Sequence, residues 1–343
     1  MIYRKQKDYD KFKCIADKCP KSCCIGWQIM IDEDSLDKYA NITGDFAPRL
    51  NSSIDFNEGS FIQHDTRCSM LNDNGLCDLH STLGEENLCV TCKQYPRHIE
   101  EFQDLREYSL SLSCPEAVRI ILQPDYDFTL MESDDDITDD PEEFDDFDFL
   151  IFDKLEFARD KMFEIANDKS KSLQERMSII KASALKLQEL YDEGDIFSMD
   201  DVSYGTPAAL DFDYCINSLD TLLSMEVLEE SWLDTIRDTK AFWQNKTPES
   251  SQWNDAMYPD SDVEFIFEKV FKSLLFTYFC GAVYDGQIYA RAMIAIQSVR
   301  WLMMMSYANK SCELNSTIYL YSREVEHSDI NVNTLIKFFE DEL

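Results

Sequence analysis

Apolar residues recur every three or four positions along most of the C-terminal two-thirds of the chain. The clearest stripe is about six turns long and comprises Phe144, Phe147, Ile151, Leu155, Ala158, Met162 and Ile165. This spacing places apolar side chains on one face of an α-helix. The same period covers 207–229, 231–243, 262–284, 286–308 and the tail 331–343. The pattern predicts a mainly α protein with an all-helical domain over 131–343.

Local sequence signals predict where one helix begins and where it ends. Ser172 followed by Glu175 is a capping box, in which each side chain bonds the other residue's backbone at a helix start. Gly194 is a typical C-terminal stop, because glycine adopts the left-handed conformation that ends many helices. We therefore expect a helix that begins after Ser172 and ends at Gly194.

The first 130 residues have a different pattern. Trp27, Ile29 and Ile31 alternate with other residues and predict one short strand, and Asp32 is placed to cap a following helix. The segment 72–75, Asn-Asp-Asn-Gly, is a strong turn signal. Over 1–130 the sequence indicates a module of loops, turns and short elements, packed on the helical domain and dependent on a bound metal for its folding.

Between these parts lies a dense run of acidic residues. Eleven carboxylates occur among the seventeen residues of 132–148. Like charges at this density repel one another and resist compaction. We interpret 131–148 as an exposed acidic linker.

Charge and composition exclude several classes of function. The net charge of −35 argues against binding to nucleic acid or to an anionic membrane. It indicates either solubility, as in a cell with high internal salt, or a cationic partner, and composition alone does not separate the two. The longest apolar stretch, 273–284, is too short to span a bilayer. No G-x-G occurs, so no dinucleotide or phosphate loop is present. The start of the chain has no apolar signal region, and we expect a cytoplasmic protein.

Nine of the twelve cysteines lie within the first 114 residues. In a chain with no secretory signal, such a cluster favours a metal centre over disulfides. The pairs Cys19–Cys23 and Cys89–Cys92 have the spacing of zinc knuckles. The other gaps, of 43, 8 and 21 residues, are irregular and favour a [4Fe–4S] cluster, with zinc as the alternative and core thiols as a third.

Other candidate ligands are weaker. His80 and His98 follow cysteines closely, but each is more typical of a surface or capping residue. Cys215, Cys280 and Cys312 fall inside helical patterns, and we expect them in the helical core. No hydrolase motif occurs, and the sequence identifies neither a catalytic base nor cofactor-binding residues.

Four cysteine-containing blocks, spread over about residues 10–120, resemble the flagellin lysine-N-methylases. The same order occurs in a broader family of cysteine-cluster proteins that chelate zinc or iron. The blocks are CPKSCCIGW at 19–27, CSML at 68–71 with GLC at 75–77, CKQYPR at 92–97 and LSCPE at 112–116. Beyond residue 130 we recognise only a helical, acidic character.

The resemblance implies methyl transfer from S-adenosylmethionine to lysine ε-amines of flagellin by an iron–sulfur protein. It implies eight metal-ligand cysteines: Cys14, Cys19, Cys23, Cys24, Cys68, Cys77, Cys92 and Cys114. Cys89 stands where a serine-like residue is expected and is counted as extra. The alternative function is a chelating or redox module without methyl transfer.

Overall fold

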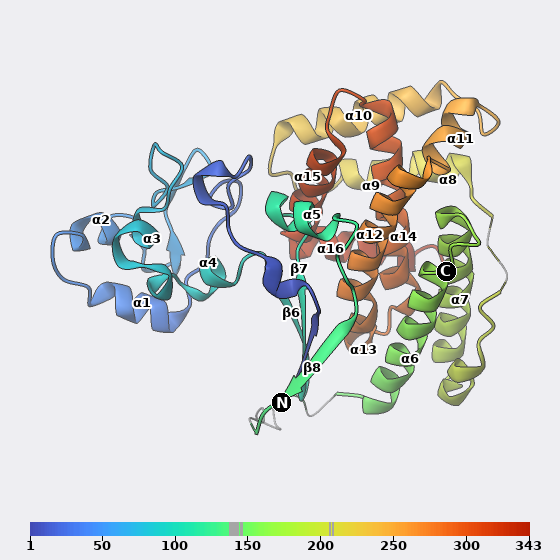
Figure 1. Cartoon of the computed structure of the whole chain (residues 1–343), viewed down its shortest axis with the longest axis horizontal. Helices are drawn as coiled ribbons and strands as arrows, with labels where there is room; N and C mark the ends of the chain where they lie inside the picture. The colour runs from blue at the N-terminus through green and yellow to red at the C-terminus, as the bar shows by residue number, and fades with distance from the viewer. Residues whose placement is uncertain (137–143, 145–146, 206, 208) are drawn as a thin grey trace.

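The computed structural model describes residues 1–136, 144, 147–205, 207 and 209–343. A small cysteine-rich unit lies on one side of the molecule, a sheet lies in the middle, and a layered helical domain forms the other side (Figure 1). The chain starts in the sheet, leaves it to form the cysteine-rich unit, and returns to it before entering the helical domain.

The sheet has four strands in the order β6-β7-β1-β8. They are β1 (Ile2–Gln6), β6 (Arg97–Phe102), β7 (Leu105–Leu110) and β8 (Leu130–Asp134). β1 pairs parallel with β7 and antiparallel with β8. β8 includes residues 131–134 at the start of the expected linker; they are exposed, as expected, and they form a strand. Their backbone pairs with that of β1. The rest of the expected linker includes 137–143 and 145–146, which lie outside the described residues.

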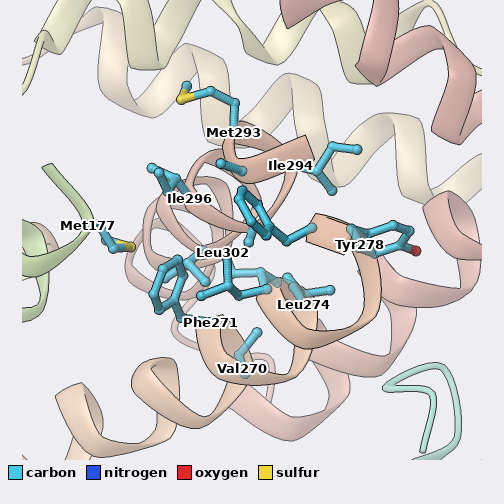
Figure 2. Close-up of a cluster of buried hydrophobic side chains, with 14 of the residues drawn as sticks. Met177, Val270, Phe271, Leu274, Tyr278, Met293, Ile294, Ile296 and Leu302 are labelled. Atoms are coloured by element: carbon cyan, nitrogen blue, oxygen red, sulfur yellow. The ribbon is translucent and has the colours of Figure 1, made fainter. Parts of the chain in front are cut away.

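The helical domain is built around α14 (Ile288–Ala308), which is buried on nearly every side. It packs against α7 (Leu173–Asp192), α10 (Glu230–Gln244), α12 (Ser261–Tyr278) and α16 (Asp329–Glu340). In Figure 2, Met177 of α7 points toward the buried side chains of α12 and α14, among them Phe271 and Leu302. A helix that is apolar all round belongs in the centre of a domain, which explains its position.

Further helices surround this centre. They are α5 (Pro115–Ile121), α6 (Phe149–Ala166), α8 (Phe212–Asn217), α9 (Leu219–Leu223), α11 (Ser251–Met257), α13 (Ala282–Asp285) and α15 (Leu314–Glu326). The mainly α class is therefore confirmed. The period alone did not predict α11 or α15, and the stretch 207–229 contains two short helices instead of one.

The local helix signals are confirmed. Ser172 and Glu175 form a complete capping box at the start of α7. Gly194 follows the end of this helix with φ of +73°, which is the left-handed conformation expected of the stop. Asp32 caps α1 (Glu33–Ala40) by accepting a hydrogen bond from the backbone N–H of Ser35. These signals act over three or four residues and are therefore readable from sequence.

The cysteine-rich unit has a small hydrophobic core of its own. Its elements after α1 are α2 (Ala47–Asn51), β2 (Ile54–Asp55), β3 (Ser60–Phe61), β4 (Gln63–His64), β5 (Arg67–Cys68), α3 (Asp78–Leu83) and α4 (Val90–Gln94). Ile29 and Ile31 are buried in this core, as their alternation suggests. The strand expected there is absent among the described residues: Ile25 and Met30 form only single bridges.

The larger of the two hydrophobic clusters contains residues on both sides of residue 130. Residues such as Phe12, Phe102 and Val118 belong to the same buried cluster as the helical domain. The second cluster runs from Ile29 to Cys89. The sheet and α5 therefore pack with the helices, while the division at 130 stays a proposal.

A buried ion pair fastens the sheet to the helical domain. Both guanidinium Nη atoms of Arg159 in α6 donate to the carboxylate of Glu107 in β7 at 2.6 Å. The Arg159 and Glu107 side chains are 3% and 1% exposed, so neither charge can turn to water instead. Arg4 of β1 adds a more distant contact to Glu107 at 3.6 Å.

We predict that Glu107→Gln lowers the free energy of unfolding by about 3–5 kcal/mol, because it leaves the buried Arg159 charge with only the more distant Glu156 carboxylate, at 3.8 Å, as counter-ion. Glu132→Gln removes an ion pair to Arg4 whose carboxylate is 57% exposed, and it should cost less than about 1 kcal/mol. Chemical denaturation of both variants measures the difference. Equal losses in the two variants would contradict the role given to the buried pair.

Candidate functional site

The loop 19–27, which carries three of the predicted ligands, is held by a side chain of the helical domain. Arg323 of α15 donates from Nη2 to the backbone carbonyl of Ile25 at 2.6 Å, and more weakly to that of Ser22 at 3.4 Å. Gly26 has φ of +109°, and a Cβ atom there would lie 3.4 Å from Nη2 of Arg323. The glycine therefore permits both the backbone conformation and the close approach of the arginine.

Three rings gather beside this loop. The indole of Trp27 stacks on the imidazole of His327, with ring centroids 4.0 Å apart and planes at 27°. The ring of Tyr95 lies 5.5 Å from Trp27 and 5.6 Å from His327. The guanidinium of Arg323 sits 4.4 Å from the Trp27 ring centroid, in a cation–π contact. The cysteine-rich unit and α15 therefore meet through aromatic packing.

A cleft of about 340 Å³ opens at this junction. Its walls include the thiols of Cys23, Cys24 and Cys92 and the rings of Trp27, Tyr95 and His327. Its remaining lining residues are Gln28, Ile29, Thr91, Gln94 and Arg97. A volume of this size is within the range of small-molecule sites. Most of the lining comes from the cysteine-rich unit, and His327 comes from the helical domain.

The eight predicted ligands form two neighbouring groups. Cys24 interacts electrostatically with Cys68, Cys77 and Cys92. Cys14, Cys19 and Cys114 interact in the same way with one another. Cys23 interacts with members of both groups. The fold thus gathers thiols from segments 100 residues apart, and all twelve cysteines, each of them described, are free thiols.

Hydrogen bonds and burial set the protonation of these thiols. The Cys23 thiol donates a hydrogen bond to the Cys24 sulfur, which raises the pKa of Cys23 and lowers that of Cys24. The Cys89–Cys92 pair behaves alike, with the pKa of Cys89 lowered and that of Cys92 raised. Burial raises the pKa of Cys68 to about 12 and that of Cys114 to about 11. Binding of a metal would therefore release protons.

The thiols do not form a finished metal site as they stand. Within the described ranges, no group of three or more His, Cys, Asp or Glu side chains is arranged to hold an ion. The donor chemistry nevertheless suits zinc or iron, since three free thiols line one cleft and interact electrostatically with further thiols. Rotation of these side chains would be needed to bring them onto one centre.

The other cysteines and histidines considered as ligands lie in different surroundings. Cys89 is fully buried in the core of the cysteine-rich unit. His80 is exposed on α3, and His98 lies in β6 with its Nε2 2.6 Å from a carboxylate oxygen of Glu100. Cys215 and Cys280 are buried in the helical domain as expected. The expectation for Cys312 is wrong: it is exposed in the turn between α14 and α15, beyond the apolar stripe.

Sequence reasoning missed Arg323 and His327. Arg323 lies in the last turn of α15 and His327 directly follows the end of that helix, four residues later, so both project from the same face. Their partner, Trp27, is about 300 residues away in sequence, so no local pattern joins them. The only available signal was a cationic and a titratable residue at helical spacing in an acidic domain, which is a weak one.

Comparison with known proteins finds a matching family model and several similar proteins. A family model described as the FliB lysine N-methylase C-terminal domain matches residues 159–343. A lysine-N-methylase of Salmonella typhimurium (strain LT2) is 30% identical over 125 residues, which are 34% of this chain and 31% of that protein. A lysine-N-methylase of Salmonella choleraesuis is 31% identical over 124 residues, or 33% and 31% of the two chains.

A third relative is matched over a larger share of its own length. The flagellar biosynthetic protein FliU of Salmonella muenchen is 31% identical over 124 residues, which are 33% of this chain and 73% of that protein. The match thus spans about a third of the length of the two lysine-N-methylases. No solved structure matches the chain. In the described part of the chain, no helix has the length and apolar character needed to cross a membrane.

The stacked histidine predicts a pH dependence of stability. Burial, with help from the Arg323 charge, lowers the pKa of His327 to about 4, against about 6.5 in an unfolded chain. Between these values the folded protein binds fewer protons, so stability falls as pH drops from about 6.5 to about 4. His327→Phe keeps a stacked ring but cannot protonate. Its unfolding free energy should fall less over this window, by up to roughly 3 kcal/mol.

Unfolding by denaturant at several pH values tests this directly. Parallel pH profiles for the wild type and His327→Phe would show that the imidazole does not titrate against burial.

Proposed function

Because this chain belongs to the FliB lysine N-methylase family, we propose that it is a protein-lysine N-methyltransferase that modifies flagellin and takes its methyl group from S-adenosylmethionine. One observation supports a location for this reaction in the molecule. The cleft joins the cysteine-rich unit to His327, which lies in the segment that matches the family's C-terminal domain. Both recognised parts of the chain therefore contribute to one cavity.

The reaction needs a neutral amine next to an activated methyl group. The lysine ε-ammonium first loses a proton, and its nitrogen lone pair then attacks the methyl carbon of the sulfonium. The new N–C bond forms as the C–S bond breaks, and the sulfur leaves as a neutral thioether. A protein accelerates this step chiefly by holding the nitrogen, carbon and sulfur in line.

The residues of the cleft suit the binding and shielding parts of this task. Trp27 and Tyr95 provide apolar walls that exclude water from one side, and Tyr95 is fixed by a hydrogen bond between its hydroxyl and that of Ser113 at 3.1 Å. Burial raises the pKa of Tyr95 well above its usual value, so this phenol stays protonated. It serves as a wall of the cleft, and the proton of the lysine ε-ammonium passes to solvent water.

The surface charge supports a basic protein substrate. A net charge of −35 attracts a lysine-bearing partner at long range and accelerates encounter at low ionic strength. Free thiols throughout the chain are the state that a reducing compartment maintains, which supports a cytoplasmic reaction. The FliU relative, a flagellar biosynthetic protein by name, supports flagellin as the substrate.

We also propose that the cysteine-rich unit holds a metal centre through Cys14, Cys19, Cys23, Cys24, Cys68, Cys77, Cys92 and Cys114, with [4Fe–4S] favoured over zinc. When bound, such a centre supplies covalent cross-links between the loops and a Lewis-acidic metal beside the cleft. The protein's own contribution is the position of the thiols: Cys23 and Cys24 are held by the Arg323-bound loop, and Cys92 lies in α4.

The methyl-transfer proposal predicts a mass change. Purified protein, S-adenosylmethionine and flagellin from the same organism should give flagellin carrying increments of one methyl group on lysine. Raising the ionic strength should slow the reaction, because salt screens the attraction between the acidic protein and its basic substrate. Flagellin that remains unmodified in the assay and carries no methyl-lysine in the cell would leave only the chelating module.

The metal proposal predicts colour and stability. Anaerobic purification should give a brown protein, and Cys92→Ser should lower its metal content and thermal stability well beyond Cys215→Ser, which changes a thiol in the helical core. Colourless protein with stoichiometric zinc would overturn the iron–sulfur assignment. Equal, small losses in both variants would argue against Cys92 as a ligand.

A further inference from the structure

The cleft has the opposite electrostatic character from the rest of the protein. The chain contains 67 Asp and Glu residues, yet the described residues that line the cleft include neither type. The one formally charged side chain on its walls is the guanidinium of Arg97. An acidic protein that keeps carboxylates away from one cavity disfavours a bare cation there and favours a ligand with a negative group.

Arg97 has spare hydrogen-bonding capacity. Eight of the chain's arginines form ion pairs with carboxylates, for example Arg49 with Asp78 and Arg237 with Asp234. Among the described residues, Arg97 has no such ion pair. It makes one long hydrogen bond to the carbonyl of Lys93 at 3.4 Å and stacks on Phe12 at 5.3 Å. Its planar fork therefore remains available for a carboxylate from outside the chain.

A second buried cation strengthens this field. Arg323 is 2% exposed and forms no ion pair in the described part of the structure, and its Nη1 is buried without a hydrogen-bond partner. It lies against Trp27, a wall of the cleft. Both guanidinium groups thus raise the potential near the cavity, and neither forms an ion pair with a carboxylate of the described chain.

The rings of the cleft select a flat group. Trp27, Tyr95 and His327 lie within 5.6 Å of one another, centroid to centroid. Nε2 of His327 is buried and has no hydrogen-bond partner, so a polar edge of a ligand could complete it. A planar heterocycle meets both conditions, since its face stacks on rings and its edge carries hydrogen-bonding atoms.

We propose that the cleft binds a small ligand that joins a planar heterocycle to a carboxylate, with the heterocycle against Trp27, Tyr95 and His327 and the carboxylate on Arg97. This deepens the proposed function and rests on it, because a sulfonium donor of the adenosyl type has this composition. The cleft is then the donor pocket. Arg97 sets its specificity, and the substrate lysine approaches from the open side.

The first test changes only the ligand. Calorimetric titration of the anaerobically purified wild-type protein compares S-adenosylhomocysteine with its carboxyl methyl ester, which keeps the heterocycle but loses the negative charge. The ester should bind at least about 10-fold more weakly, as expected for loss of a charge-assisted bidentate contact. Equal affinities would overturn the inference without recourse to any variant.

The second test changes the protein. Arg97→Gln should abolish the discrimination between the acid and the ester, and Arg97→Lys should retain part of it. Trp27→Leu should weaken both ligands by a similar factor, since stacking does not depend on the carboxylate. Arg237→Gln, at an exposed arginine of α10, is the matched control and should bind both ligands as the wild type does. Discrimination that persists in Arg97→Gln would assign the carboxylate to another group.

The results also separate this inference from the proposed function. If the wild type methylates flagellin but binds acid and ester equally, methyl transfer stands and the cleft assignment is wrong. If Arg97-dependent discrimination is found without methylation of any lysine, the ligand site stands and the methyltransferase proposal is wrong.

Discussion

The ion pair between Glu107 and Arg159 is the contact on which the arrangement of the molecule depends. It fixes β7 to α6, and β7 is the strand to which both β1 and β6 are hydrogen-bonded. Those two strands are the chain's exit to the cysteine-rich unit and its return. The position of the thiols, and hence of the cleft, is therefore set by a sheet that one buried salt bridge ties to the helical core.

The junction adds a second attachment of a different kind. Arg323 reaches from α15 to the backbone of the loop 19–27, and Trp27 returns the contact by packing on Arg323 and His327. The contact buries a guanidinium that forms no ion pair with a described carboxylate, so it carries an electrostatic cost that ordinary domain packing avoids. That cost is understandable if the positive charge serves a ligand or a thiolate-bound metal nearby.

Local chemistry made much of the fold predictable. The cap at Asp32, the box at Ser172 and the stop at Gly194 each depend on neighbours a few residues away, and all are present. The parallel pairing of β1 with β7 joins residues about 100 positions apart, and nothing in either strand's own pattern specifies it. The strand at the start of the acidic run was not predicted for the same reason, since Leu130–Asp134 owes its extended form to pairing with β1.

Only part of the candidate site could be predicted from the sequence. Cysteine spacing pointed to the loops that form the cleft, and Cys23, Cys24 and Cys92 do line it. The contributions of Arg323 and His327 require two segments to meet in space, and no residue near them in sequence marks that meeting. The family model matches the helical domain, where sequence reasoning found only general helical character.

The meeting of the two ends of the cysteine-rich unit has a consequence for how the protein unfolds. Phe12 and Arg97, which bracket the unit in sequence, stack on each other at 5.3 Å. The intervening chain is therefore a closed excursion with its own core, fastened at its base. Such a segment can open and close as a separate cooperative unit while the sheet and helices stay folded. Hydrogen-exchange protection would then fall into two free-energy classes, with the cysteines between Phe12 and Arg97 in the lower one and Cys114 in the higher one.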